Sequence, residues 1–361
     1  MAFSFGFSGD DIDIDDTELN NETPDVAVPQ GKTNFLPELV KANKHDMDEW
    51  LSILPSQISF NTLAIGDTPI TISRREIFDI RTQLMAEDSE GHDNEELIAG
   101  LEEGDLKPNF YEGGFKTWEC ALDLAKLVTG ETSVDAQTDV HIIELGAGTA
   151  VPSLALFAHA LSQTESTQRK TRFTFADYNE SVLRLVTLPN LILTWQNSQS
   201  QTATSVVGGE VPPAQDEELD ITPELLDAFK SDLVRRGISL EFISGAWSPE
   251  FVDFAFCSRG SEECQTLVLA SETIYSPSSL VAFSETLLAL LRHSSTASRK
   301  SRALVAAKKV YFGVGGGVDE FLSVLKNVCA DELEVQQKVD VQFEGVGRVV
   351  LEITPTANAV K

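Results

Sequence analysis

The chain has 361 residues, of which 57 are acidic and 27 are basic, so its formal net charge at pH 7 is −30. This length suffices for one large domain with extensions, and the charge excludes nucleic-acid binding through a basic surface. The negative charge suits a basic protein partner, or it lies in solvated segments. The cysteines form no close pairs and the histidines are scattered, so we expect neither a zinc site nor a disulfide framework.

The first 110 residues are expected to surround the core. Residues 1–31 contain no Lys or Arg and carry the acidic run "GDDIDIDDTELNNE", which is typical of a disordered tail. The initial "FSFGF" can add an edge strand, dock in a groove or remain unstructured. Residues 32–110 are predicted to be an irregular extension that packs on the core. Neither a secretion signal nor a membrane span is apparent, so we expect a soluble protein in a reducing compartment.

From residue 111 onward, helices and strands alternate. "TWECALDLAKLVTG" is an amphipathic helix with Thr117 as the expected N-cap and Gly130 as the stop signal. Buried strands such as "VHIIEL", "RFTFADY", "LVLASE" and "RALVAAKK" are each followed by an apolar helix. Repeated units of this kind predict a parallel sheet with helices on both faces.

Two segments depart from this alternation. "VDVQFEGVGRVVLEITP" near the C-terminus reads as a hairpin that adds antiparallel strands at the sheet edge. Residues 196–237 are rich in Gln, Ser and acidic residues. We predict that they form a flexible, solvent-exposed insertion.

The stretch "HIIELGAGTAVPSLAL" predicts a strand, a glycine turn and a helix. Gly146 and Gly148 allow a tight turn and close approach to a ligand, and the following helix offers free N–H groups. Val151 stands where a dinucleotide fingerprint requires a third glycine. Glu144 would repel a pyrophosphate but suits a ligand that carries an ammonium and a sulfonium. A purely structural strand–turn–helix is the alternative.

The next strand ends in "FADYN". Asp177, with Asn179 beside it, can accept hydrogen bonds from a ribose diol; alternatively, Asp177 caps the helix that starts near Glu180. Glu-Leu-Gly-x-Gly followed about thirty residues later by an acid at a strand end is the usual pattern of an S-adenosylmethionine site. The combination is much more specific than either half.

Further polar and small residues follow other strands, where open α/β sheets bind ligands. Trp247, after Gly245 and Ala246, stacks on an adenine or fills the core. "SETIY" places a carboxylate, two hydroxyls and a phenol at a strand end. The glycine run 313–317 lacks the Lys-Ser/Thr of a phosphate-binding loop and is interpreted as a mobile rim or close-approach backbone.

Six motifs in order resemble the eukaryotic protein-histidine N-methyltransferases, seven-β-strand enzymes. They are "YEGGFKTWECALDL", "ELGAGTAVPSLAL", "FADYNESVLRLVTLPN", "SGAWSP", "ASETIYSP" and "KKVYFGVGGGVDEF", and the match spans roughly 111–354. The initial "FSFGF" also resembles that family's N-terminus. The resemblance implies an α/β, Rossmann-like seven-stranded sheet, mostly parallel with an antiparallel C-terminal hairpin, and a methyltransferase domain over 111–361.

The resemblance also implies roles for single residues. The residues expected to bind S-adenosylmethionine are Phe115, Lys116, Thr117, Trp118, Glu144, Gly146, Gly148, Asp177, Asn179, Gly245, Ala246, Trp247 and Ser271. Glu272 and Tyr275 are the expected catalytic residues. Related protein-lysine enzymes carry Asp-x-x-Tyr at this position, so Glu272 is a departure that fits a histidine acceptor. The family more often has another small or acidic residue in place of Ala246.

The resemblance implies methyl transfer to a histidine of a large-subunit ribosomal protein, by a monomer in the cytoplasm and nucleus, without a metal. Glu272 is expected to accept the imidazole N–H, while Tyr275 packs beside the imidazole ring. In the alternative, Glu272 has only the structural role of ordering the strand end. A protein-lysine methyltransferase and a cofactor-binding ribosome assembly factor remain alternatives. An NAD-linked oxidoreductase is disfavoured by Val151.

Overall fold

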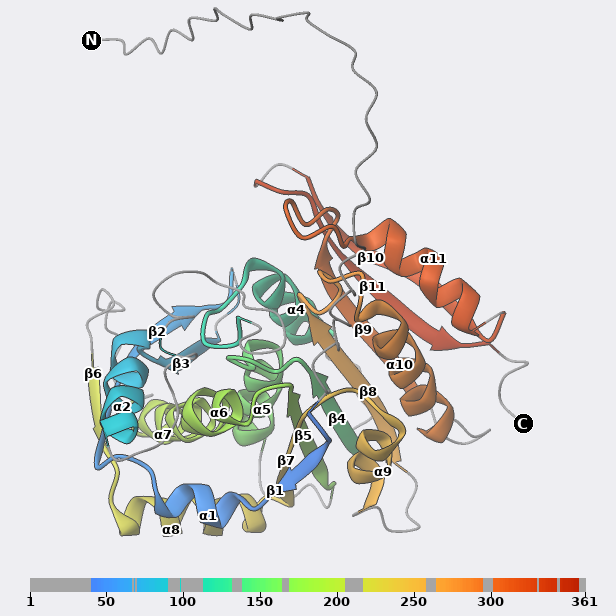
Figure 1. Cartoon of the computed structure of the whole chain (residues 1–361). Helices are drawn as coiled ribbons and strands as arrows, with labels where there is room; N and C mark the ends of the chain where they lie inside the picture. The colour runs from blue at the N-terminus through green and yellow to red at the C-terminus, as the bar shows by residue number, and fades with distance from the viewer. Residues whose placement is uncertain are drawn as a thin grey trace, which may run out of the picture. The chain divides into compact units, whose positions relative to one another are not determined.

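A computed structural model describes residues 40–66, 68, 70–89, 98, 113–131, 138–163, 169–204, 217–257, 264–294, 301–329, 331–342 and 345–356 (Figure 1). The predicted acidic tail 1–31, and with it the "FSFGF" segment, lies outside the described residues. So do the middle of the predicted insertion and most of residues 90–112.

One eight-stranded sheet forms the centre of the fold, in the order β1-β7-β5-β4-β8-β9-β11-β10. The strands are β1 (Asn43–His45), β4 (Asp139–Leu145), β5 (Thr171–Asp177), β7 (Ile238–Ser244), β8 (Cys264–Ser271), β9 (Ser301–Lys308), β10 (Leu333–Val341) and β11 (Arg348–Pro355). The five strands from β7 to β9 are parallel, and the C-terminal pair β10–β11 is antiparallel. The predicted seven strands and their C-terminal hairpin are confirmed. The extension adds β1 as an eighth strand, antiparallel to β7.

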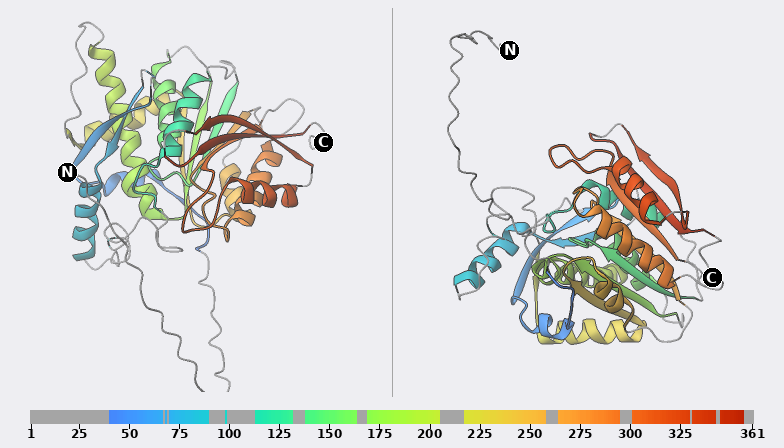
Figure 2. Two further views of the ribbon diagram at one scale, coloured as in Figure 1. Left: turned by 90° about the horizontal axis from the view of Figure 1, so that it is seen from above. Right: turned by 45° about the vertical axis from the view of Figure 1, so that its right-hand side comes forward.

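Helices cover both faces of this sheet (Figure 2). One face carries α4 (Glu119–Gly130), α5 (Val151–Ser162) and α7 (Leu188–Thr204), and the other carries α9 (Pro249–Cys257), α10 (Leu280–Ser294) and α11 (Val318–Cys329). Side chains alternate between the two cores, as Ile142 and Ile143 of β4 illustrate. Because helices cover both faces of the sheet, the central strands consist of apolar residues throughout, without alternating polar residues.

The extension is more regular than its composition indicates. It contributes α1 (Met47–Ser52), β2 (Gln57–Ala64), β3 (Thr71–Arg75) and α2 (Ile77–Ser89), besides β1. β2 and β3 form a second, antiparallel sheet together with β6 (Glu217–Asp220), in the order β3-β2-β6. Trp50 of α1 is buried against Phe242 of β7, with ring centroids 5.3 Å apart, so the extension packs on the core.

The prediction of a flexible insertion is wrong at both ends of 196–237. Residues 196–204 are the end of α7, and residues 217–235 form β6 and α8 (Pro223–Arg235), in which Phe229 is completely buried. The Trp195 indole donates a hydrogen bond of 2.8 Å to Asp232, and its ring packs on Phe229. The helix begins with Thr222, which accepts from the Leu225 N–H, followed by proline. This start signal was present in the sequence but was obscured by the acidic composition.

Replacing Phe229 with Ala tests whether α8 is an integral part of the fold. Loss of a fully buried phenylalanine is expected to lower the free energy of unfolding by about 3–5 kcal/mol, measured by urea denaturation. Val234→Ala on the same helix is the control, because Val234 is exposed and its replacement should change stability by less than about 0.5 kcal/mol. Equal stabilities of the two variants would contradict the assignment.

Candidate functional site

The glycine turn after β4 is closely surrounded by other backbone. Gly146 and Gly148 have φ values of 64° and 51°, in the left-handed region that favours glycine. A Cβ atom on Gly146 would lie 2.8 Å from the Cγ2 of Thr273, and one on Gly148 would lie 3.1 Å from the carbonyl oxygen of Gly114. The Ala147 N–H donates to the Ala176 carbonyl at 2.8 Å, which ties the turn to β5. The predicted strand–turn–helix is therefore present, and no side chain fits at either glycine without movement.

Residues 113–118 lie against this turn. The Trp118 indole N–H donates to the Gly113 carbonyl at 3.0 Å, and the Thr117 hydroxyl donates to the Thr149 hydroxyl at 3.0 Å. The prediction that Thr117 is the N-cap of α4 is wrong, because Trp118 occupies the N-cap position.

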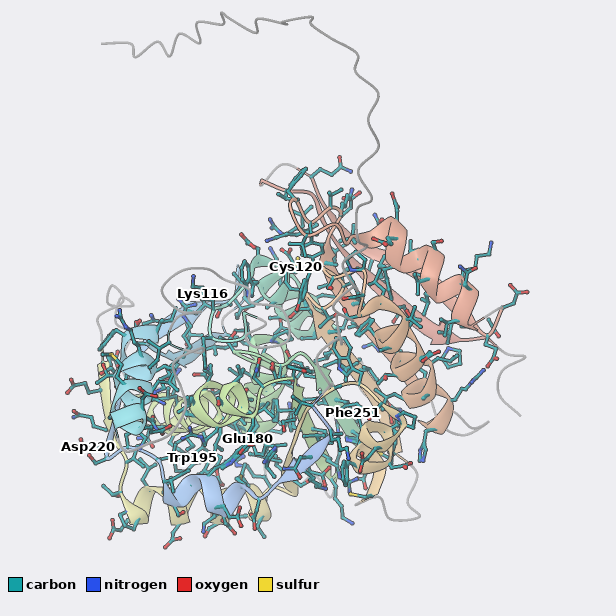
Figure 3. All side chains as sticks on the ribbon, in the orientation of Figure 1. Lys116, Cys120, Glu180, Trp195, Asp220 and Phe251 are labelled. Atoms are coloured by element: carbon teal, nitrogen blue, oxygen red, sulfur yellow. The ribbon has the colours of Figure 1, made fainter. Side chains whose placement is uncertain are left out.

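Phe115 anchors the same segment. It is buried in a small apolar cluster with Ile80 and Leu84 of α2 and with Val182. Figure 3 places the neighbouring Lys116 in the region between α2 and α4. The four residues predicted from the resemblance are thus adjacent to the glycine turn, held there by the N-terminal extension.

Asp177 at the end of β5 also contacts the turn. Its Oδ2 accepts from the Gly148 N–H at 3.0 Å, and its Oδ1 accepts from the Asn179 N–H at 3.1 Å. Asn179, rather than Asp177, occupies the N-cap position of α6 (Glu180–Val182), which contradicts the alternative that Asp177 only caps this helix. A carboxylate oxygen can accept two hydrogen bonds, so these two contacts do not by themselves prevent Asp177 from accepting hydroxyl groups.

The loop after β7 contacts the backbone of Asp177. The Gly245 N–H donates to the Asp177 carbonyl at 3.0 Å, and the Ala246 N–H donates to the Val40 carbonyl at 2.9 Å. A Cβ atom on Gly245 would lie 2.4 Å from the Lys41 carbonyl oxygen. Residues just before β1 therefore line this loop, which the sequence did not indicate.

Trp247 follows in the same loop. Its ring packs against Phe283 of α10, with centroids 5.0 Å apart and an interplanar angle of 61°. It is only partly buried, in the core on that face of the sheet. This packing favours the core-filling alternative over stacking on a ligand.

Glu144 is a buried carboxyl beside the glycine turn. Its Oε2 accepts from the Ser153 N–H at 3.1 Å, and its Oε1 has no hydrogen-bond partner among the described residues. Burial raises the pKa of Glu144 to about 8, although the hydrogen bonds from Ser153 act in the opposite direction and the charge of Asp177 adds to the rise. A buried carboxyl with an unused oxygen fits a ligand that brings a positive charge or an N–H group.

The end of β8 carries Ser271 and Glu272. The Glu272 N–H donates to the Ala306 carbonyl at 2.9 Å, and Glu272 has a φ of 57°, which is unusual for a residue with a side chain. The Glu272 side chain is 10% exposed, and its Oε1 lies 3.7 Å from Lys308 Nζ. This oxygen has no hydrogen-bond partner among the described residues.

Lys308 at the end of β9 links two carboxylates. Its Nζ is 3.0 Å from Glu119 Oε2 and lies 5.1 Å from the centroid of the Trp118 ring. Burial alone would lower the pKa of Lys308, but the hydrogen bond to Glu119 and the charge of Glu272 raise it. The ammonium is therefore a fixed positive charge between the two acids.

Two further residues near Glu272 were not predicted. Burial, together with the charge of Glu272, raises the pKa of the Cys120 thiol and of the Tyr311 phenol, so both remain protonated. The Tyr311 ring packs on Tyr275 with centroids 6.3 Å apart, and its hydroxyl accepts from the Lys308 N–H at 3.2 Å. Tyr311 belongs to the quoted motif "KKVYFGVGGG", but nothing in the sequence indicated which face it occupies.

A cleft of about 640 Å³ opens beside this cluster. It is lined along α4 by Glu119, Leu122, Asp123 and Lys126, and opposite α4 by Lys308 and Arg348. Among the residues that the structure describes, no group of His, Cys, Asp and Glu side chains is arranged to hold a metal ion. Within those same residues, no helix combines the length and apolarity needed to span a membrane.

The chain is similar in sequence to curated proteins of several organisms. No family model matches. Histidine protein methyltransferase 1 of Saccharomyces cerevisiae is 34% identical over 354 residues, covering 92% of this chain and 92% of that protein. The protein of the same name from Schizosaccharomyces pombe is 33% identical over 354 residues, covering 97% and 92%. The Histidine protein methyltransferase 1 homolog of Bos taurus is 30% identical over 251 residues, covering 69% and 57%.

The raised pKa of Glu144 predicts a pH dependence of stability. Between the ordinary pKa of about 4.5 and the folded value of about 8, the folded chain holds a proton that the unfolded chain has lost. Stability should therefore fall as the pH rises through this window, on the order of 3 kcal/mol between pH 5 and pH 8. Glu144→Gln should lack this part of the slope in urea denaturation at the two pH values. Identical slopes for both proteins would show that Glu144 titrates normally.

Proposed function

The chain belongs to the Histidine protein methyltransferase 1 family, and from this premise we propose that it methylates a histidine of a large-subunit ribosomal protein. The methyl donor is S-adenosylmethionine, which supplies an electrophilic methyl group on a sulfonium. The observation that carries the proposal is the Glu272 carboxylate, nearly buried at the end of β8 with an oxygen that accepts no hydrogen bond from the described residues.

The residues around the glycine turn fit this donor. Gly146 and Gly148 allow close approach of a ligand to the backbone, and the unused oxygen of Glu144 suits its ammonium group. Asp177 offers lone pairs to a ribose diol, and the loop at Gly245 borders the same edge. Residues 115–118 would cover the methionine end. These assignments explain why a carboxylate, and not a phosphate-binding glycine, accompanies the turn.

The side chain that accepts the methyl group determines what the protein must supply at the Glu272 end of the site. A lysine would first have to lose a proton, at a cost of roughly 4.6 kcal/mol from a pKa of about 10.4 to pH 7. A histidine with a pKa of about 6.5 is already mostly neutral at pH 7. It requires only that its unattacked nitrogen keeps the proton, because the other nitrogen must offer its lone pair.

Glu272 meets this requirement. Its Oε1 accepts the imidazole N–H, holds the productive tautomer, and stabilises the positive charge that develops on the ring. The rings of Tyr275 and Tyr311 pack on each other beside it and form a wall for a planar acceptor. Lys308 balances part of the charge of Glu119 and Glu272, so that one net negative charge faces the imidazolium.

Glu272→Gln is expected to lower turnover by about 10²–10³-fold, because the amide places no negative charge against the imidazolium. Donor affinity, measured by calorimetry, should stay within about twofold, since Glu272 lies at the acceptor end. Glu119→Gln is the matched control: it removes the other carboxylate partner of Lys308, so turnover should fall far less. Unchanged turnover in Glu272→Gln would refute the catalytic role.

Identification of the modified residue tests the function itself. The purified chain would be incubated with methyl-labelled S-adenosylmethionine and with ribosomal proteins from cells that lack the enzyme, and the labelled residue mapped by mass spectrometry. A labelled histidine in a large-subunit protein is the expected result. A labelled lysine would establish the alternative acceptor chemistry, and labelling of non-ribosomal proteins alone would overturn the proposed substrate class.

The net charge of −30 supports a basic acceptor protein. Opposite net charges accelerate encounter, and dissolved salt screens this attraction over distances beyond about 10 Å. Association with basic ribosomal proteins, followed by stopped-flow fluorescence, should slow about tenfold when salt rises from about 0.05 to 0.5 M. A flat response over that range would mean that the charge serves only solvation.

The same substrate class leads to two further parts of the proposal. The enzyme works in the cytoplasm and nucleus, where ribosomal proteins are made and assembled. We also propose that it acts as a monomer.

A further inference from the structure

The loop that follows β9 presents three apolar side chains to solvent. Val310, Phe312 and Val314 are 50%, 79% and 41% exposed. They belong to residues 309–317, which connect β9 to α11, and we call these residues the rim loop. Several exposed apolar residues on one short loop commonly mark a surface that another molecule covers.

The rim loop is an ordered piece of backbone. Val310 and Gly317 form a bridge, and the Tyr311 N–H donates to the Gly316 carbonyl at 3.0 Å. The Val318 N–H donates to the Lys309 carbonyl at 3.2 Å. The exposure of Phe312 therefore reflects a backbone that holds it outward.

The rim loop is also attached directly to the acceptor end of the site. The Gly316 N–H donates to the Tyr275 carbonyl at 3.0 Å, and a Cβ atom on Gly316 would lie only 2.2 Å from that oxygen. Tyr311, which belongs to the loop, packs its ring on Tyr275. The predicted close approach of the glycine run is thus present at Gly316.

Lys308, the last residue of β9, connects the rim loop to the cleft. Its backbone leads into the loop, while its side chain lines the cleft along α4 and contacts Glu272. The rim loop and the cleft therefore both adjoin Lys308, the residue whose side chain contacts Glu272. A polypeptide that delivers a side chain to Glu272 comes close to the rim loop.

We propose that the rim loop is the docking surface for the acceptor protein, and that Phe312 packs on apolar side chains adjoining the acceptor histidine. This inference rests on the proposed function, because the occupant is the protein whose histidine reaches Glu272. The continuity of the loop with Tyr275 selects this occupant. The loop is unsuited to a nucleic acid, since its cation, Lys309, pairs with Asp340 at 2.7 Å.

The test compares Phe312→Ser with Phe78→Ser. Phe78 on α2 is likewise exposed, at 56%, and α2 lies well away from β9 and α11, which the rim loop connects, in both Figure 1 and Figure 2. With ribosomal proteins from cells lacking the enzyme as acceptor, Phe312→Ser should raise KM for the acceptor at least about tenfold. Its kcat and its donor affinity should stay within about twofold. Phe78→Ser should match the wild type in all three.

Three results would overturn the docking surface. The first is an equal KM in both variants. The second is a wild-type dimer that Phe312→Ser dissociates without a change in KM, which would assign the loop to a second copy. The third is a lower KM in Phe312→Ser, which would mean that a segment of the same chain covers the loop.

A second measurement separates this inference from the function on which it rests. Full-length protein with p-benzoylphenylalanine at position 312 would be irradiated in the presence of the same ribosomal proteins. Cross-linking to the labelled acceptor supports the docking surface, and labelling of a histidine without any cross-link rejects it. If the wild type labels no histidine, the proposed function fails. Cross-linking to one ribosomal protein would then still locate the docking surface, and its absence would reject both.

Discussion

The parallel pairing of β4 with β5 and β8 is the constraint on which the rest of the site depends. Leu145 at the end of β4 is in register with Ala176 of β5 and with Ala270 of β8. The three strands therefore end at one level, and their next residues meet: the glycine turn, Asp177 and Ser271. In the sheet, β5 and β7 lie on one side of β4, and β8 and β9 lie on the other. The strand order therefore reverses at β4, and ligands of open α/β sheets bind at such a point.

Backbone contacts, more than side chains, hold this edge together. The Gly148 N–H donates to Asp177, and the Ala147 N–H donates to the Ala176 carbonyl. Gly114 and Thr273 crowd the turn so closely that a Cβ atom at Gly146 or Gly148 would collide or press on them. Unusual left-handed φ values at Ala150 and Glu272 occur at the same edge. Strain of this kind persists only where the surroundings impose it, and it is concentrated at the two ends of the proposed site.

The segments outside the parallel sheet complete the site. β1 pairs with β7, and the residues just before β1 bond to the loop at Ala246. Buried residues of α2 surround Phe115 and so hold residues 113–118 against the glycine turn. β2 pairs on one side with β3 and on the other with β6, which comes from the chain after α7, so the extension and the insertion form one structural unit. The extension therefore does more than cover the core, because it positions residues of the proposed site.

The sequence by itself determined the parallel core, since its signals are local. Continuous apolar runs such as "VHIIEL" require burial on both faces, and glycines at 146 and 148 require a turn. The positions of Glu144, Asp177 and Glu272 at strand ends followed from the same patterns. Strand ends meet at one edge in any parallel sheet, so their convergence was predictable as well.

Only the tertiary structure decided what surrounds Glu272. Cys120, Lys308 and Tyr311 come from three separate elements, and no local pattern states that their side chains converge on one carboxylate. The tertiary structure also decided that β1 pairs at the sheet edge and that Phe229 of α8 is buried, although its neighbours in the sequence are acidic. These features depend on contacts between residues far apart in the chain. Such contacts form only when the packed core brings those residues together, so a reading of one segment at a time does not contain them.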